Sequence, residues 1–163
     1  MEKAALKEHR RHSTADKPFS YYISNIPEYF PNAPMHWHKE FELNVILEGE
    51  GDFVTGDIHF TAYKGDIVLT PPDMLHAVYQ HDDKRCVYDT IDLDGSMLGS
   101  RDNGRAADAF IAPLISGAYS IETHITPEHC YYSELLTTAE NMISAAKGDT
   151  PLLDMLIKSE LLR

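Results

Sequence analysis

The chain has 163 residues, the length of one ordinary domain, and 43% of them are hydrophobic, which argues against wholesale disorder. Its 14 Lys and Arg against 26 Asp and Glu give a net charge of −12, which disfavours direct binding to nucleic acid phosphates. No apolar run approaches the roughly 18 residues that span a bilayer, and the first residues lack the apolar core of a signal peptide. We therefore expect a cytoplasmic domain with no membrane partner.

The first part of the chain predicts an arm followed by strands. Residues 1–18 are charged and aperiodic, which predicts a flexible N-terminal arm. Beyond them, short apolar or alternating runs are separated by turn residues such as Thr55-Gly56-Asp57, where Gly accepts the positive φ of a tight turn. The expected strands include Phe41–Leu47, Asp52–Val54, Ile58–Tyr63, Ile67–Thr70, His76–Tyr79 and Cys86–Leu93. This regular spacing predicts a mainly β domain over residues 19–125, built as an antiparallel sandwich or barrel.

The last part of the chain predicts two helices. Before them, the apolar segment Phe110–Ile115 is expected to return to the sheet as a strand. Thr126-Pro127-Glu128 combines a cap, a proline at the first helical position and an acid in the first turn, and the helical periodicity that follows ends at Gly148. Thr150-Pro151 predicts the start of a second helix. This helix reaches Arg163 without a stop signal, so we expect the polypeptide to continue.

The second predicted helix carries apolar residues on more than one face. These residues are Leu152, Leu153, Leu156, Ile157 and Leu161. A single barrel surface does not cover them all, so we predict that residues 126–163 form a helical segment that joins two copies as a homodimer. The alternative is that both helices pack entirely on their own barrel.

Histidines and a glutamate gather in two segments of the predicted barrel. Residues two apart on a strand face the same way, so His36, His38 and Glu42 project to one side, and His76 follows a proline turn that can bring it to the same centre. Imidazoles with a carboxylate suit Zn, Fe, Ni or Mn better than Ca or Mg, and Zn or Ni is expected in purified protein because both bind imidazole tightly. A protonated histidine–glutamate network would also balance the buried charge. The sequence leaves both open, and it requires no cofactor.

The same alternation predicts which residues line a pocket. Asn44 and Ile46 share the face of Glu42, whereas Trp37 lies on the other face and joins the candidates because an indole beside a pocket can contact a ligand. Polar groups converging in an apolar barrel suit a hydroxylated small molecule such as a sugar. No nucleophile–base arrangement is present, so no catalytic residue is predicted and we expect no enzyme.

Two patterns in the sequence resemble the motifs of the cupin family. They read His36-x-His38-x₃-Glu42-x₆-Gly49 and Gly65-x₅-Pro71-x₄-His76. The second pattern departs from the family where Asp73 replaces the usual Gly and Gln80 the frequent Asn. The resemblance implies a cupin-type double-stranded β-helix, a jelly-roll barrel of about eight strands. It also implies that the four matching side chains hold a metal. The change at Asp73 affects the turn that aims the second-motif histidine.

Longer stretches, within residues 19–163, resemble the N-terminal sensor domain of AraC-type transcription regulators. These stretches are residues 36–43, 47–51, 64–72, 110–117 and 156–162. In that family a jelly-roll sensor is followed by dimerising helices and by two helix-turn-helix units. The resemblance implies an effector-binding and dimerisation domain that contacts DNA only through a further domain, absent from these residues. Two alternatives remain: a metal-dependent cupin enzyme, either an isomerase or a dioxygenase, and a plain dimerisation module.

Overall fold

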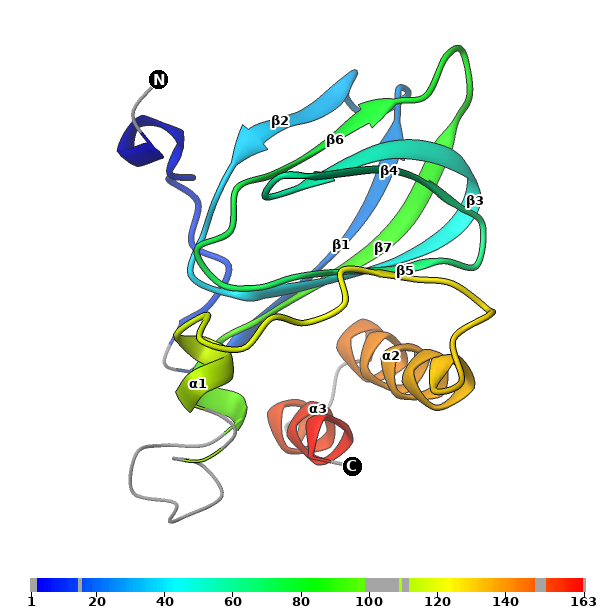
Figure 1. Cartoon of the computed structure of the whole chain (residues 1–163). Helices are drawn as coiled ribbons and strands as arrows, with labels where there is room; N and C mark the ends of the chain where they lie inside the picture. The colour runs from blue at the N-terminus through cyan, green and yellow to red at the C-terminus, as the bar shows by residue number, and fades with distance from the viewer. Residues whose placement is uncertain (1–2, 15, 99–108, 110–111, 149–151, 163) are drawn as a thin grey trace.

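The protein is described by a computed structural model that covers residues 3–14, 16–98, 109, 112–148 and 152–162. The strands form a barrel, and helices pack beneath it (Figure 1). The strands are β1 (Phe19–Ile26), β2 (Asn32–His36), β3 (Phe41–Thr55), β4 (Ile58–Tyr63), β5 (Ile67–Thr70), β6 (His76–Gln80), β7 (Cys86–Leu93) and β8 (His124–Ile125). The helical segments are η1 (Lys3–Leu6), η2 (Gly95–Leu98), α1 (Ala112–Ile115), α2 (Tyr132–Lys147) and α3 (Leu153–Leu161). This confirms the predicted mainly β jelly roll with two C-terminal helices.

The long strand β3 belongs to both sides of the barrel. Its first half pairs with β5 and β7, and its second half pairs with β4 and β6, all antiparallel. The register with β7 shifts between Ile46 and Glu48, where the strand bends. Gly49 follows the shift with φ +74, and a Cβ built on it would lie 1.7 Å from the carbonyl oxygen of Arg85. Only glycine fits this close approach between strands.

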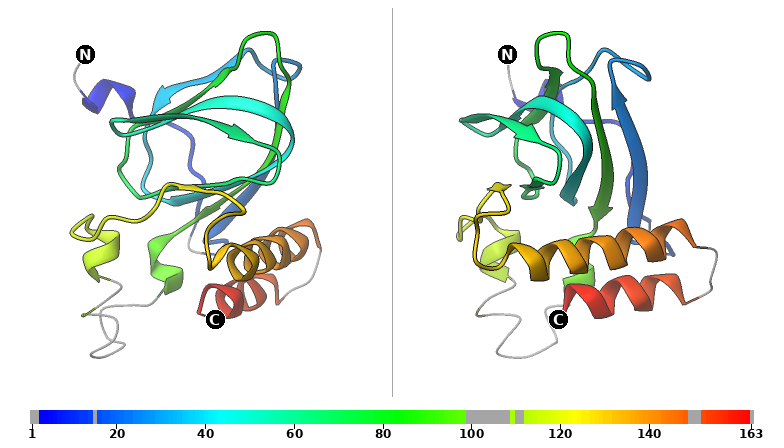
Figure 2. Two further views of the ribbon diagram at one scale, coloured as in Figure 1. Left: turned by 45° about the vertical axis from the view of Figure 1, so that its right-hand side comes forward. Right: turned by 90° about the vertical axis from the view of Figure 1, so that its right-hand side faces the viewer.

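Among the described residues, two apolar clusters hold the molecule together. The cluster between the barrel and the helices contains Phe19, Leu43, Val45, Ile67, Ile91, Leu93, Met97, Ile125, Ala139, Met142, Ile143 and Ile157. The cluster inside the barrel contains Ile26, Ile46, Phe53, Ala62, Val68, Val78, Cys86 and Tyr88. Helices α2 and α3 lie side by side beneath the barrel, and α2 contacts β1 and β7 (Figure 2). The alternation along β3 therefore separates an interior face from a helix-facing one.

The prediction of a strand over Phe110–Ile115 is wrong. Residues 112–115 form α1, whereas residues 110–111 lie outside the described part of the chain. Pro113 has no N–H to donate to a sheet and is readily accommodated in the first turn of a helix. The strand that returns to the sheet is β8, where His124 pairs with Val68 of β5.

Helix α2 begins later than predicted. Thr126 and Pro127 lie in turns, and the helix starts at Tyr132. The reason is local: the backbone N–H of Thr126 donates to Nδ1 of His129 at 3.0 Å, and the N–H of His129 donates to the carbonyl of Thr126 at 3.1 Å. This turn competes with the helix. Gly148 ends α2 as predicted, and Thr150-Pro151 lies outside the described residues.

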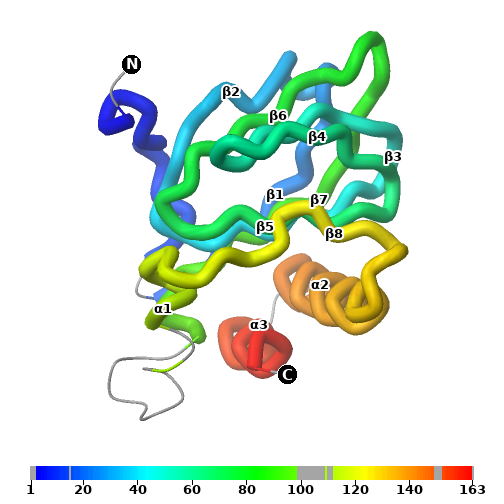
Figure 3. The backbone as a smooth tube through the Cα atoms, in the orientation of Figure 1, coloured from blue at the N-terminus to red at the C-terminus, as the bar shows by residue number. Residues whose placement is uncertain are grey.

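The N-terminal arm lies along the β2 side of the barrel (Figure 3). Lys7 forms an isolated parallel bridge with Trp37, and Glu8 N–H donates to the Trp37 carbonyl at 3.0 Å. Trp37 N–H in turn donates to the Leu6 carbonyl at 3.1 Å. These bonds hold the arm beside the segment that joins β2 to β3.

Candidate functional site

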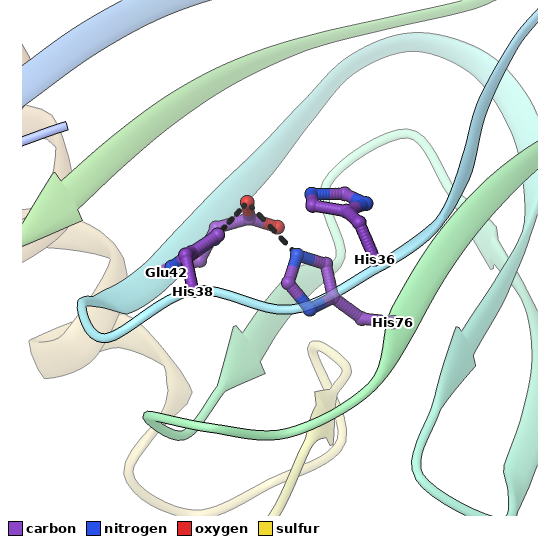
Figure 4. Close-up of side chains that lie close together, drawn as sticks. All are labelled: His36, His38, Glu42 and His76. Atoms are coloured by element: carbon purple, nitrogen blue, oxygen red, sulfur yellow. Dashed lines mark hydrogen bonds and ion pairs between the residues drawn. The ribbon is translucent and has the colours of Figure 1, made fainter. Parts of the chain in front are cut away.

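Four side chains from β2, β3, β6 and the segment that joins β2 to β3 meet at one place. His36 ends β2, His38 lies in the turn that follows, Glu42 lies near the start of β3, and His76 begins β6 (Figure 4). His36 and His76 are paired across β2 and β6, and their ring centroids are 4.1 Å apart. One ligand-type atom from each of the four lies within 4.8 Å of the others. The structure thus brings together the four residues proposed from the sequence as metal ligands, a set we call the histidine centre.

Backbone carbonyls orient two of the imidazoles. Nδ1 of His36 lies 2.7 Å from the carbonyl of Pro34, and Nδ1 of His76 lies 2.9 Å from the carbonyl of Met74. Because a carbonyl only accepts, each Nδ1 carries the hydrogen and donates it, which leaves Nε2 available as a ligand. Nε2 of His76 is buried, has no hydrogen-bond partner among the described residues, and lies 3.6 Å from Oε2 of Glu42. A buried nitrogen of this kind fits a cation.

Glu42 is held from the opposite side by a chain of hydrogen bonds. Nδ2 of Asn44 donates to Oε1 of Glu42 at 2.7 Å, and the Thr90 hydroxyl donates to Oδ1 of Asn44 at 2.6 Å. Nε2 of His38 lies 3.4 Å from Oε2 of Glu42. These hydrogen bonds leave Oε2 of Glu42 directed at the histidines, which is the orientation that a metal ligand needs.

The electrostatics of this centre favour positive charge beside Glu42. Burial alone would raise the pKa of Glu42, but the imidazoles of His76 and His38 outweigh it and hold the pKa well below its usual value. Burial alone would lower the pKa of His76, but Glu42 reverses this effect and the pKa is raised. A divalent ion bound by neutral imidazoles would provide the same compensation.

Asp73 takes the backbone conformation that glycine usually supplies. Its φ is +61, in the left-handed region where Asp is among the more tolerated residues. The backbone N–H of Asp73 donates to the carbonyl of His38 at 2.8 Å, and Nζ of Lys39 donates to its Oδ2 at 2.9 Å. The departure from the cupin pattern therefore leaves the turn before His76 intact.

A cavity of about 450 Å³ lies against the histidine centre. Its polar and charged lining comes from β1, β2, β3, β6, β7 and the arm. These residues are Glu8, Arg10, His12, Tyr22, Ser24, Asn32, His36, Glu42, His76, Thr90 and Asp92. Apolar side chains complete the wall: Ile23, Phe30, Ala33, Pro34, Val78 and Tyr88, whose hydroxyl is the one polar group among them. The volume suits a small molecule.

Four other residues proposed for the pocket are not among the described residues that line this cavity: Trp37, His38, Asn44 and Ile46. Asn44 is buried behind Glu42, and Ile46 is packed in the apolar cluster inside the barrel. The ring of His38 lies 4.9 Å from that of His76, measured between centroids. Trp37 faces the arm, where its indole N–H donates to the carbonyl of Lys3 at 2.7 Å.

Two arm residues beside the centre had no predicted role. His12 is buried, with Nε2 2.8 Å from Oε2 of Glu8 and Nδ1 2.8 Å from Oδ2 of Asp92. Burial alone would lower the pKa of His12, but these two carboxylates raise it to about 11. Glu8, His12 and His38 also form a second group of ligand-type atoms that lie within 4.8 Å of one another. A charged, aperiodic segment contains no sequence signal for these contacts.

With the fold and the site described, the chain can be placed among known proteins. Residues 17–162 match the sequence profile of the AraC-like ligand binding domain. The chain belongs to this family. The match spans the barrel and both C-terminal helices, which confirms the resemblance to AraC-type sensors and the cupin-type barrel. The chain is therefore an AraC-like ligand-binding domain.

The relatives of this chain include a transcriptional regulator. An uncharacterized HTH-type transcriptional regulator, YdeC of Bacillus subtilis, is 27% identical over 84 residues, which are 51% of this chain and 29% of that protein. The chain thus matches less than a third of that relative's length.

Similar solved structures include a cupin 2 barrel domain protein from Salinispora arenicola. It is 18% identical, with 68% of this chain and 81% of that chain covered and a TM-score of 0.42. DMSP lyase DddQ from Ruegeria pomeroyi is 22% identical, with 53% of this chain and 41% of that chain covered and a TM-score of 0.42.

Among the described residues of the chain, no helix is long and apolar enough to cross a bilayer.

Proposed function

We propose that this chain is the effector-sensing domain of a cytoplasmic transcription regulator. The observation that carries the proposal is the cavity of about 450 Å³, whose wall is made by the barrel and the arm together. A small molecule in this cavity contacts both, so its binding energy depends on where the arm lies. An effector that binds one arrangement better than another shifts the population between them. A DNA-binding domain elsewhere in the polypeptide would respond to that shift.

The lining favours a hydroxylated effector such as a sugar. Tyr22, Ser24 and Thr90 offer hydroxyls, and Asn32 and Asp92 offer an amide and a carboxylate. Such groups pair with hydroxyls that both donate and accept hydrogen bonds. The apolar side chains beside them suit the C–H faces of the same molecule.

The histidine centre is proposed to hold a divalent transition ion, with Zn and Ni as the first candidates. His36, His38 and His76 would bind through imidazole nitrogens and Glu42 through its carboxylate. The support is the orientation of two imidazoles by carbonyls, together with the buried Nε2 of His76, which has no hydrogen-bond partner within the described part of the chain. A bound cation would offset buried negative charge and attract an oxygen of the effector.

The outer face of α3 is proposed to form the homodimer contact. Leu152 and Leu156 are exposed, at 56% and 46%, as are neighbouring Met155 and Leu162. Leu153 and Leu161 pack partly against the core, and Ile157 is fully buried in it, so they support the helix from below. In sedimentation, Leu156→Asp is expected to shift dimer toward monomer. Ile58→Asp, which introduces the same charge at an exposed apolar position of β4, is the matched control. A wild-type chain that stays monomeric at high concentration would contradict the proposal.

A panel of monosaccharides and polyols tests the effector proposal. We expect one member to raise the melting temperature and to bind in calorimetry, with Thr90→Val abolishing the heat of binding because its hydroxyl lines the cavity and holds Asn44. Ile58→Thr, at an exposed position on β4, is the control. If no member of the panel binds, a hydroxylated effector is excluded.

The second candidate is a metal-dependent cupin enzyme, an isomerase or dioxygenase. It is favoured by one observation, that His36, Glu42 and His76 line the cavity and would leave a bound ion accessible to a substrate. Incubating the metal-loaded domain with its bound molecule separates the two functions. A sensor returns the molecule unchanged in mass spectrometry and in chromatography, whereas an enzyme accumulates product over time.

A further inference from the structure

We propose that Glu8 of the N-terminal arm is an additional ligand of the ion in the histidine centre, so that metal binding fastens the arm to the barrel. This inference rests on the metal site proposed above and goes beyond it, because it links metal occupancy to the position of the arm. The group it adds comes from a part of the chain outside the barrel motifs.

The distances place Glu8 at the edge of the centre. Oε2 of Glu8 lies 3.6 Å from Nε2 of His36, the nitrogen left free by the hydrogen bond of Nδ1 to Pro34. Bonds from Zn to nitrogen or oxygen are about 2.0–2.2 Å long, so neighbouring ligand atoms around one ion lie about 3.0–3.5 Å apart. Glu8 also groups with His38 and His12 within 4.8 Å. It therefore adjoins two of the histidines of the centre on the side of the arm.

The backbone of the arm holds Glu8 in this place. Glu8 N–H donates to the carbonyl of Trp37, and Trp37 N–H donates to the carbonyl of Leu6. Trp37 lies between His36 and His38 in the sequence, so the bridge ties the arm to the segment that carries both histidines. The side chain of Glu8 is only 28% exposed, and its Oε2 lies toward His36 and His12 rather than into solvent.

A contact with His12 orients the same carboxylate. His12 bridges Oε2 of Glu8 and Oδ2 of Asp92 in β7, at 2.8 Å on each side. Ligating carboxylates are commonly held by such outer hydrogen bonds. His12 thus acts as a positioning residue between the arm and the barrel.

The negative charge of the carboxylates around the histidine centre also favours a bound cation. Glu8, Glu40, Glu42 and Asp92 surround the centre, and Oε2 of Glu40 lies 3.5 Å from Nδ1 of His38. Charged His12 balances one of these four carboxylates. A divalent ion bound between neutral imidazoles would balance two more and would draw Glu8 inward from its present 3.6 Å separation from His36.

Zinc affinity and arm cleavage test the inference on the full chain. Affinity is measured by competition with a chromophoric chelator, and cleavage by limited trypsin digestion after Lys7, Arg10 and Arg11 with mass-spectrometric detection. We expect Zn to slow arm cleavage of the wild type at least about tenfold. We expect Glu8→Gln to weaken Zn binding about 10–100-fold and to remove this protection.

Matched variants separate ligation from general effects. Glu48→Gln changes an exposed carboxylate of β3, and His9→Ala changes an exposed histidine of the arm, so both are expected to keep wild-type affinity and protection. His36→Ala is expected to abolish Zn binding, with circular dichroism confirming that each variant is folded.

The results test the metal site of the histidine centre and the role of Glu8 separately. If the wild type binds no Zn, both the metal site and the inference are overturned. If wild type and Glu8→Gln bind Zn equally, or if Zn leaves arm cleavage of the wild type unchanged, the inference is overturned and the metal site stands. The wild-type comparison with and without Zn decides the matter even where a variant is unstable.

Discussion

The two faces of the same strands in this barrel have opposite chemistry. On β3, Glu42 and Asn44 point to the histidine centre, whereas Leu43 between them packs toward the helices. On β7, Asp92 lines the cavity, and its neighbour Ile91 is buried in the cluster between the barrel and the helices. One residue of displacement along a strand thus separates a binding surface from an apolar core. The helix-facing side supplies stability, and the interior side concentrates charge that is costly without a partner.

The helix-facing side should show the largest loss of stability on substitution. Ile91 is fully buried between the barrel and α2, so Ile91→Ala is expected to lower the free energy of unfolding by about 2–5 kcal/mol. Urea denaturation followed by circular dichroism measures this change. Ile23→Ala, half-exposed on β1, is the control and is expected to cost well under 1 kcal/mol of burial energy. Equal losses at both positions would mean that α2 does not cover this face.

A metal ion bound on the interior side, in the histidine centre, should stabilise the domain. At a free Zn concentration of 100 times the dissociation constant, the free energy of unfolding is expected to rise by about 2.7 kcal/mol. His38→Ala is expected to remove the gain, because His38 belongs to the centre. His59→Ala, at an exposed position of β4, is expected to retain it.

Elemental analysis after dialysis without chelator gives an independent measure of the same site. We expect Zn or Ni in the wild type and in His59→Ala, and neither in His38→Ala. A wild-type sample with less than about a tenth of an equivalent of transition metal would contradict a tight site.

The strands were predictable because alternation and turn residues are local signals. The single strand β3 was predicted as separate segments, since the bend at Gly49 resembles a turn in the sequence and its continuity depends on pairing with other strands. The strand predicted over Phe110–Ile115 was wrong because apolar composition does not distinguish a short strand from one helical turn, and Pro113 favours the latter.

The candidate site was predictable only in part, because only some of its residues belong to a local sequence pattern. His36, His38 and Glu42 follow strand alternation, and the second motif adds His76. His12 gave no such signal, because its position depends on a contact with Asp92 in β7, 80 residues further along the chain. A contact of this kind is set by tertiary structure and leaves no periodic pattern in a charged arm.

The smallest expected effect concerns a charged contact on the helix-facing side. Asp89 of β7 is buried on the helix-facing side, where it accepts hydrogen bonds from Nζ of Lys147 at 2.9 Å and from the hydroxyl of Tyr21 at 2.6 Å. Its neighbour Thr90 faces the cavity, so the ion pair of Asp89 and Lys147 connects α2 to a strand that lines this cavity. Lys147→Met is expected to lower the free energy of unfolding by about 1 kcal/mol, since the lysine is half-exposed and Tyr21 still satisfies Asp89.

The pH dependence of that loss distinguishes an ion pair from simple packing of the lysine stem. The hydrogen bond to Asp89 raises the pKa of Lys147, so the stabilisation is fully present below the unfolded-state value of about 10.4 and is lost as pH rises through the folded-state pKa. The difference in unfolding free energy between wild type and Lys147→Met should therefore be constant near neutral pH and shrink above about pH 10.4. Lys158→Met, at an exposed position of α3, is expected to show no such change. A difference that persists unchanged at high pH would assign the contribution to apolar contact of Lys147 with the Tyr21 ring, over which its ammonium lies 5.2 Å from the centroid.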